Sequence, residues 1–125
     1  MSRLPLVIYT YAKCSTCRDA TRWLRDHGLA FEERPIRETP PALAELRAML
    51  RAQDGEIRRL FNTSGMDYRA QNLATRLPGL TEAEAFDLLR GNGNLVKRPF
   101  VLAPDGTGLV GFKPDAWKKA LLPAG

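Results

Sequence analysis

The chain has 125 residues, of which 44% are hydrophobic and 26% are charged, as in an ordinary soluble globular protein. This length suits a single domain, 1–125, and no stretch approaches the ~20 apolar residues needed to cross a bilayer. The net charge of +5 comes from arginines interleaved with carboxylates, which argues against direct binding of nucleic acid. We therefore expect a cytoplasmic protein that engages neither a membrane nor nucleic acid.

The first third of the sequence predicts a strand, a helix and a second strand. Residues 5–9 form an apolar run typical of a buried strand, and a connecting loop follows at 11–13. A helix is expected from about Ser15, and a cationic last turn followed by Gly28 ends it. The segment 29–36 places a few apolar residues among charges, which indicates a half-exposed strand. The order is βαβ.

The middle of the sequence predicts a helical insert at about 39–92. Thr39 is the expected cap of a first helix that Pro40 and Pro41 open, because proline is tolerated in the first turn of a helix. A break follows at 53–55. Further helices are predicted at 56–61, at 67–73, and after the capping box Thr81-Glu82-Ala83-Glu84.

The last third of the sequence returns to strands. The runs Pro99–Leu102 and Leu109–Phe112 flank Pro104–Gly108, which has the composition of a hairpin loop. Pro114 opens a final helix with a narrow apolar stripe. The predicted fold is therefore α/β: βαβ, a helical insert, then ββα.

The only two cysteines lie in Cys14-Ser15-Thr16-Cys17, between the first strand and the first helix. Free amides and the helix dipole at a helix start favour thiolate over thiol, so Cys14 is the expected nucleophile. Lys13 and Arg18 are cations nearby in sequence, and Ser15 and Thr16 complete the loop that a substrate would meet. Cys17, one turn inside the helix, is the expected resolving thiol, which attacks a mixed disulfide formed at Cys14.

Two other interpretations of the cysteine pair remain open. Zinc binds CxxC pairs, but a structural zinc site needs four ligands, and the only other strong candidate is His27. His27 falls at the far end of the helix, on the order of 15 Å from Cys14 at about 1.5 Å per residue. We therefore expect no metal site. The second interpretation is that both thiols are inert packing residues.

A CxxC after the first strand, the two halves βαβ and ββα, and a proline opening the third strand resemble the thioredoxin-like fold. The helical insert and several segments resemble the arsenate reductase–Spx family more narrowly, and these segments are Ile8–Arg18, Leu60–Tyr68, Lys97–Pro99 and Gly111–Phe112. The resemblance implies a four-stranded mixed sheet and a cis bond before Pro99, which would face the cysteine pair. It also implies that Arg98 stabilises the Cys14 thiolate or contacts a bound anion.

The resemblance implies three functions, and we expect the first. A thiol–disulfide oxidoreductase would act on disulfide or glutathionylated substrates, with glutathione or glutaredoxin as co-reactant and no bound cofactor. A redox-sensing regulator like Spx would bind the α subunit of RNA polymerase, and Gly55 matches a glycine at that contact. An arsenate reductase would need two more anion-binding arginines, but Asn62 and the segment 110–112 stand in their places. Arg98 alone would bind a multiply charged oxyanion only weakly.

Overall fold

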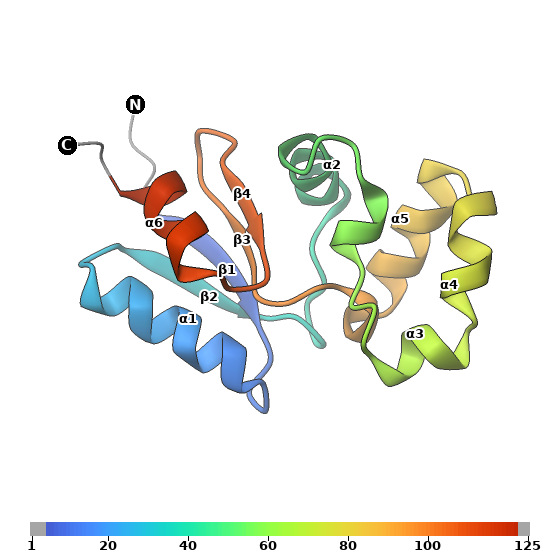
Figure 1. The fold of residues 1–125 in the computed structure, drawn as a ribbon, viewed down its shortest axis with the longest axis horizontal. Coiled ribbons are helices and arrows are strands. Elements are labelled where there is room, and N and C mark those ends of the chain that lie inside the picture. The colour runs from blue at the N-terminus through green and yellow to red at the C-terminus, as the bar shows by residue number, and fades with distance from the viewer. Residues whose placement is uncertain (1–4, 123–125) are drawn as a thin grey trace.

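A computed structural model describes residues 5–122, which form one four-stranded sheet flanked by helices (Figure 1). The strand order is β2-β1-β3-β4; β1 runs parallel to β2 and antiparallel to β3, and β4 is antiparallel to β3. The predicted mixed sheet is thereby confirmed. The elements in chain order are β1 (Leu6–Thr10), α1 (Ser15–Asp26), β2 (Phe31–Pro35), α2 (Leu43–Ala52), the 3-10 helix η1 (Ile57–Leu60), α3 (Met66–Ala70), α4 (Leu73–Arg76), η2 (Leu77–Gly79), α5 (Glu82–Gly91), η3 (Gly93–Leu95), β3 (Phe100–Leu102), β4 (Gly108–Val110) and α6 (Pro114–Leu121).

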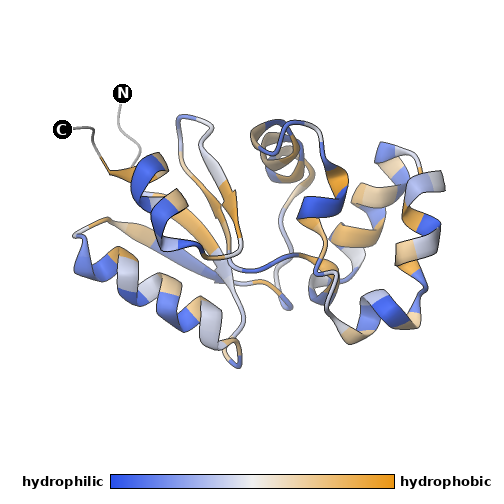
Figure 2. Cartoon of the chain, viewed as in Figure 1, coloured by the Kyte–Doolittle hydropathy of each residue, from blue (hydrophilic) through white to orange (hydrophobic). Residues whose placement is uncertain are grey.

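The sheet separates two hydrophobic clusters, because alternate side chains of a strand point to opposite faces. Leu6 and Ile8 of β1 pack with residues of α1 and α6, including Leu24 and Trp117. Tyr9 of the same strand packs on the other side with residues of α2 and the helices that follow it. In Figure 2 the β3–β4 pair is largely in hydrophobic colours, whereas the outer turns of α6 are hydrophilic. The sheet therefore contributes side chains to both hydrophobic clusters.

Helix α2 begins later than predicted. Its cap is Ala42, whose backbone N–H donates to the Glu45 carboxylate at 2.9 Å. The predicted cap, Thr39, instead donates its backbone N–H to the carbonyl of Pro35 at 2.8 Å. The prediction was wrong because a proline pushes the residue before it toward extended backbone, so the Pro40-Pro41 pair delays the helix.

The helix predicted at 67–73 ends earlier, at Ala70 in α3, and Leu73 begins the separate helix α4. Asn72 has a positive φ of 55°, a left-handed conformation that asparagine tolerates better than most residues. The capping box before α5 is confirmed, since the Thr81 hydroxyl accepts from the Glu84 N–H at 3.1 Å and the Glu84 carboxylate accepts from the Thr81 N–H at 2.8 Å. Within residues 5–122, no helix is long and apolar enough to span a bilayer.

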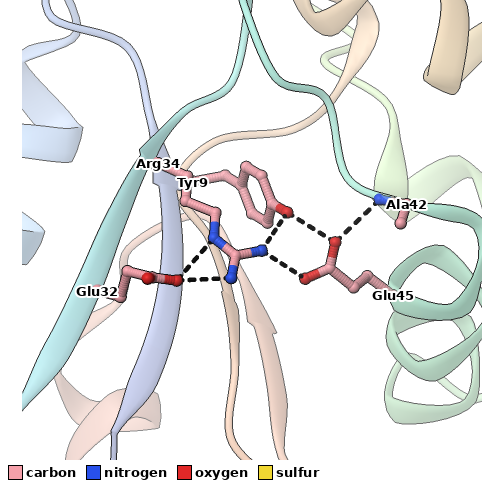
Figure 3. A network of polar contacts seen from close by, with 5 residues as sticks. All are labelled: Tyr9, Glu32, Arg34, Ala42 and Glu45. Carbon is pink, nitrogen blue, oxygen red and sulfur yellow. Dashed lines mark hydrogen bonds and ion pairs between the residues drawn. The ribbon is translucent and has the colours of Figure 1, made fainter.

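A polar network ties α2 to the sheet (Figure 3). The buried Tyr9 on β1 donates its hydroxyl to Glu45 Oε1 on α2 at 2.6 Å. Arg34 on β2 donates from Nη1 to the Tyr9 hydroxyl at 3.0 Å and forms an ion pair with Glu32. The network joins three elements at the end of β1 from which the cysteine loop departs.

Candidate functional site

Cys14 lies at the N-cap of α1, directly after the loop that leaves β1. Its sulfur accepts a hydrogen bond from the backbone N–H of Cys17 at 3.2 Å, and its own N–H donates to the Tyr11 carbonyl at 3.0 Å. The side chain of Cys14 is half-buried, whereas Lys13, Ser15 and Thr16 are exposed. The chain thus presents this sulfur to solvent at the end of the helix where unpaired amides point outward.

Cys17 is buried, with 2% of its surface exposed, and both cysteines are free thiols. Burial, and next a hydrogen bond to the Cys14 side chain, raise the pKa of the Cys17 thiol to about 12. A hydrogen bond from the Tyr11 backbone and the charge of Arg98 act in the opposite direction. Cys17 therefore holds its proton at neutral pH while Cys14 is reduced.

The Arg98–Pro99 segment carries the cis peptide bond that the resemblance implied. Pro99 is buried, and its carbonyl accepts from the Gly111 N–H at 2.9 Å. Lys97 donates its N–H to the Leu60 carbonyl at 2.8 Å. Arg98 lies between these two residues, and neither its N–H nor its carbonyl forms a hydrogen bond with another backbone group of residues 5–122. A short backbone edge is thereby left unpaired at Arg98, just before β3.

The side chain of Arg98 extends toward Tyr11 and Cys17. Its Cζ lies 5.1 Å from the centroid of the Tyr11 ring, and its charge reaches Cys17. Its Nη1 atom is buried and has no hydrogen-bond partner in the described chain. A buried guanidinium nitrogen without a partner is costly, and a bound anion would satisfy it.

Arg18 and His27 contribute to local structure. The guanidinium of Arg18 donates to the Ala12 carbonyl at 3.1 Å and so braces the loop backbone before Cys14. The Nδ1 atom of His27 lies 2.8 Å from the Trp23 carbonyl, and its ring packs against the Trp23 ring at 4.1 Å. No cluster of three His, Cys, Asp or Glu side chains able to hold a metal ion occurs between residues 5 and 122.

The structure adds neighbours that the sequence did not indicate. Arg37, just after β2, donates from Nη1 to the Tyr11 hydroxyl at 3.0 Å, and its Cζ lies 5.1 Å from the same ring. Asp67 on α3 accepts hydrogen bonds from the side-chain amides of Asn92 at 2.9 Å and Asn94 at 3.2 Å. These residues come from separate parts of the chain and share no motif, so only the folded structure brings them together.

Asn62 occupies the position expected for an arginine of the arsenate reductases. Its backbone N–H donates to the Leu95 carbonyl at 2.7 Å, and its side-chain amide lies 3.5 Å from the Asn94 carbonyl. The amide therefore links the loop at 62–65 to η3. It offers no positive charge to an oxyanion.

A family model and several relatives match this arrangement. The model of the ArsC family covers residues 9–120. The chain belongs to the ArsC family. The uncharacterized protein YusI of Bacillus subtilis is 42% identical over 117 residues, which are 93% of this chain and 98% of that protein. The global transcriptional regulator Spx of Listeria innocua is 29% identical over 93% of this chain and 86% of the regulator.

Solved structures support the same assignment for this ArsC-family protein. A crystal structure from Bacteroides fragilis, described as related to the ArsC family, has a TM-score of 0.86 and 37% sequence identity. The match covers 95% of this chain and 99% of that one. The strand order, the cis proline and the cysteine loop are thus parts of a thioredoxin-like fold.

Proposed function

We propose that this ArsC-family protein is a thiol–disulfide oxidoreductase in which Cys14 attacks the substrate and Cys17 resolves the product. One observation carries the proposal: an accessible sulfur at a helix N-cap is backed by a buried, protonated thiol on the next turn. The two sulfurs therefore differ in accessibility, as the two steps of disulfide exchange require.

In the first step, the Cys14 thiolate attacks one sulfur of a disulfide R–S–S–R′. A Cys14–S–S–R mixed disulfide forms, the original S–S bond breaks, and R′S⁻ leaves with its electron pair. The N–H of Cys17 and the dipole of α1 stabilise the attacking thiolate. The open backbone edge at Arg98 offers an extended substrate segment a place to pair beside the sulfur.

The second step is timed by the charge on Cys14. Two of the causes that raise the Cys17 pKa are a hydrogen bond to Cys14 and the charge of Cys14. Both disappear when Cys14 enters a mixed disulfide, whereas the Tyr11 backbone and Arg98 continue to lower that pKa. Cys17 therefore loses its proton more readily once a substrate is attached. It then attacks the Cys14 sulfur, releases R–SH after protonation, and leaves a Cys14–Cys17 disulfide.

An external thiol closes the cycle. Two molecules of glutathione would reduce the Cys14–Cys17 disulfide and leave as one glutathione disulfide, which balances the two electrons. We propose glutathione or a glutaredoxin for this role, with no bound cofactor. Arsenate reduction is a weaker proposal, because Asn62 supplies an amide where an arginine would hold the oxyanion.

A second candidate is a redox-sensing regulator that binds the α subunit of RNA polymerase, and the similarity to Spx favours it. Gly55 does not add support. Its φ is +79°, and its N–H donates to the Leu50 carbonyl at 2.8 Å at the end of α2. This backbone conformation by itself requires glycine.

The test is catalytic reduction of 2-hydroxyethyl disulfide, with glutathione as the reductant. We expect turnover with the wild-type protein and none with Cys14→Ser. When glutathione is left out, we expect a trapped mixed disulfide with Cys17→Ser. As a matched control, Cys14→Ser combined with Ala44→Cys restores the number of thiols at an exposed site on α2 and should not restore turnover. Stoichiometric oxidation without turnover, together with redox-dependent binding of the purified α subunit, would overturn the enzyme in favour of the regulator.

A further inference from the structure

Tyr11 connects the cysteine pair to two arginines from different parts of the chain. Its backbone carbonyl accepts from the Cys14 N–H, and its backbone contacts the Cys17 thiol. Its ring lies 5.1 Å from the guanidinium carbons of both Arg37 and Arg98. Tyr11 thus contacts both the cysteine loop and the two guanidinium groups.

Neither guanidinium is in contact with a carboxylate within the described chain. Arg37 and Arg98 form no ion pair among residues 5–122, and Nη1 of Arg98 is buried without a hydrogen-bond partner. Arg37 is exposed, and its known polar contact is the neutral Tyr11 hydroxyl. Two guanidinium groups with unused donors beside one aromatic ring form a site for a carboxylate.

A pocket of about 330 Å³ adjoins Arg37. It is lined by Arg37, Glu38, Gly91, Asn92, Gly93 and Asn94. The amides of Asn92 and Asn94 both donate to one oxygen of Asp67, Oδ2, which orients this carboxylate and leaves its other oxygen for a ligand. These amides, and after them the charges of Arg37 and Arg98, lower the pKa of Asp67. The carboxylate is therefore ionised at neutral pH and lies within electrostatic range of both arginines.

The site accordingly presents positive charge and negative charge side by side. A simple anion would be attracted by Arg37 and repelled by Asp67. A ligand that carries both an ammonium and a carboxylate on one carbon atom would satisfy both groups. The α-amino-acid group has this arrangement, and it occurs at the end of small biological thiols, among them the glutathione considered above.

We propose that Tyr11, Arg37 and Asp67 form a subsite beside the cysteine pair that binds the zwitterionic amino-acid head group of a small thiol or its disulfide. The carboxylate of the head group contacts Arg37, with Arg98 as the inner boundary of the subsite. The ammonium contacts Asp67. This inference rests on the proposed function and names the class of its small-molecule substrate.

The experiment measures oxidation of the reduced protein by four symmetric disulfides in a stopped-flow instrument. They are 2-hydroxyethyl disulfide (uncharged), 3,3′-dithiodipropionate (carboxylates only), cystamine (ammonium groups only) and glutathione disulfide (both). Each rate constant is divided by that of free dithiothreitol with the same disulfide, because the leaving thiols differ in intrinsic reactivity. We expect glutathione disulfide to have the highest normalised rate with the wild-type protein.

Two variants separate the charges. Arg37→Gln should lower the rate about tenfold with both carboxylate-bearing disulfides and leave cystamine no slower, since one hydrogen bond to a charged group is worth roughly a factor of ten. Asp67→Asn should slow glutathione disulfide and cystamine by a similar factor and spare dithiodipropionate. Arg47→Gln on α2 and Asp87→Asn on α5 are charge-matched controls at exposed positions, and both should follow the wild-type rates.

The uncharged disulfide keeps the two proposals distinguishable. If it reacts normally but Arg37→Gln and Asp67→Asn follow the wild type with every disulfide, the subsite is refuted and the oxidoreductase stands. Equal slowing of all four disulfides would assign Arg37 to loop structure alone and would also refute the subsite. If the folded wild-type protein fails to react even with 2-hydroxyethyl disulfide, both proposals fall together.

Discussion

Replacing Tyr9 by phenylalanine tests how α2 is attached to the sheet. The Tyr9 hydroxyl donates to Glu45 at 2.6 Å and accepts from Arg34 at 3.0 Å, so its removal deprives two charged groups of a partner (Figure 3). A hydrogen bond to a charged group contributes about 1.5–3 kcal/mol. We expect a loss of about 1.5 kcal/mol at pH 7, the lower end, because Arg34 and Glu45 still lie 3.4 Å apart and retain their ion pair.

The same substitution removes a pH-dependent contribution to stability. Burial, and next the hydrogen bond to Glu45, raise the pKa of Tyr9 from 10.0 to about 12. Because the folded-state pKa is the higher one, this contribution is fully present below pH 10 and is lost as the pH rises through 12. Two pH units correspond to about 2.7 kcal/mol, which exceeds the loss of about 1.5 kcal/mol at neutral pH. Above about pH 11, Tyr9→Phe should therefore become more stable than the wild type.

The assay is urea unfolding of the reduced protein at fixed pH values from 7 to 12, followed by tryptophan fluorescence. Tyr68→Phe is the matched control, since Tyr68 is a buried tyrosine outside this network. Its free energy of unfolding should stay parallel to that of the wild type. Parallel profiles for Tyr9→Phe and the wild type between pH 9 and 12 would refute the reasoning.

Three further predictions concern the site. Cys17→Ser should accumulate a stable Cys14–glutathione adduct that intact-mass spectrometry detects, whereas rapid loss of the adduct would exclude Cys17 as the resolving thiol. Arg98→Gln should slow resolution more than it slows the first attack, because the charge of Arg98 lowers the Cys17 pKa. Quenched-flow trapping of the adduct measures both steps, and an effect on attack alone would contradict this role. Gly93→Ala should destabilise the fold by about 1–3 kcal/mol in urea unfolding, since an added Cβ would lie 2.0 Å from the Ile36 carbonyl oxygen; an unchanged midpoint would show that the loop moves freely.

Local patterns in the sequence determined most elements of the fold. The apolar run before the cysteines, the capping box at Thr81 and the hairpin composition after Pro99 each specify an element through neighbouring residues, and all three elements are present. The errors arose where local signals compete. At Thr39 a capping residue competed with the following prolines, and at Asn72 a left-handed residue interrupted an otherwise helical pattern.

The cysteine pair was predictable because both sulfurs and the helix that positions them lie within a few consecutive residues. Arg98 and Pro99 were predictable only through resemblance, since the effect of the Arg98 charge on Cys17 depends on β3 pairing beside β1. Tyr11, Arg37 and Asp67 were not predictable at all. The segments that carry them meet only when the helical insert packs against the sheet, and charged residues on turns leave no periodic signal.

By itself, the sequence determined the place of both cysteines at the start of α1 and the order of strands and helices, because each depends on short-range backbone geometry. The tertiary structure alone decided which charged side chains lie near the cysteine loop. Hydrophobic packing on both faces of the sheet brings the turn after β2, helix α3 and the loop before β3 close together, and charge acts through space rather than along the chain.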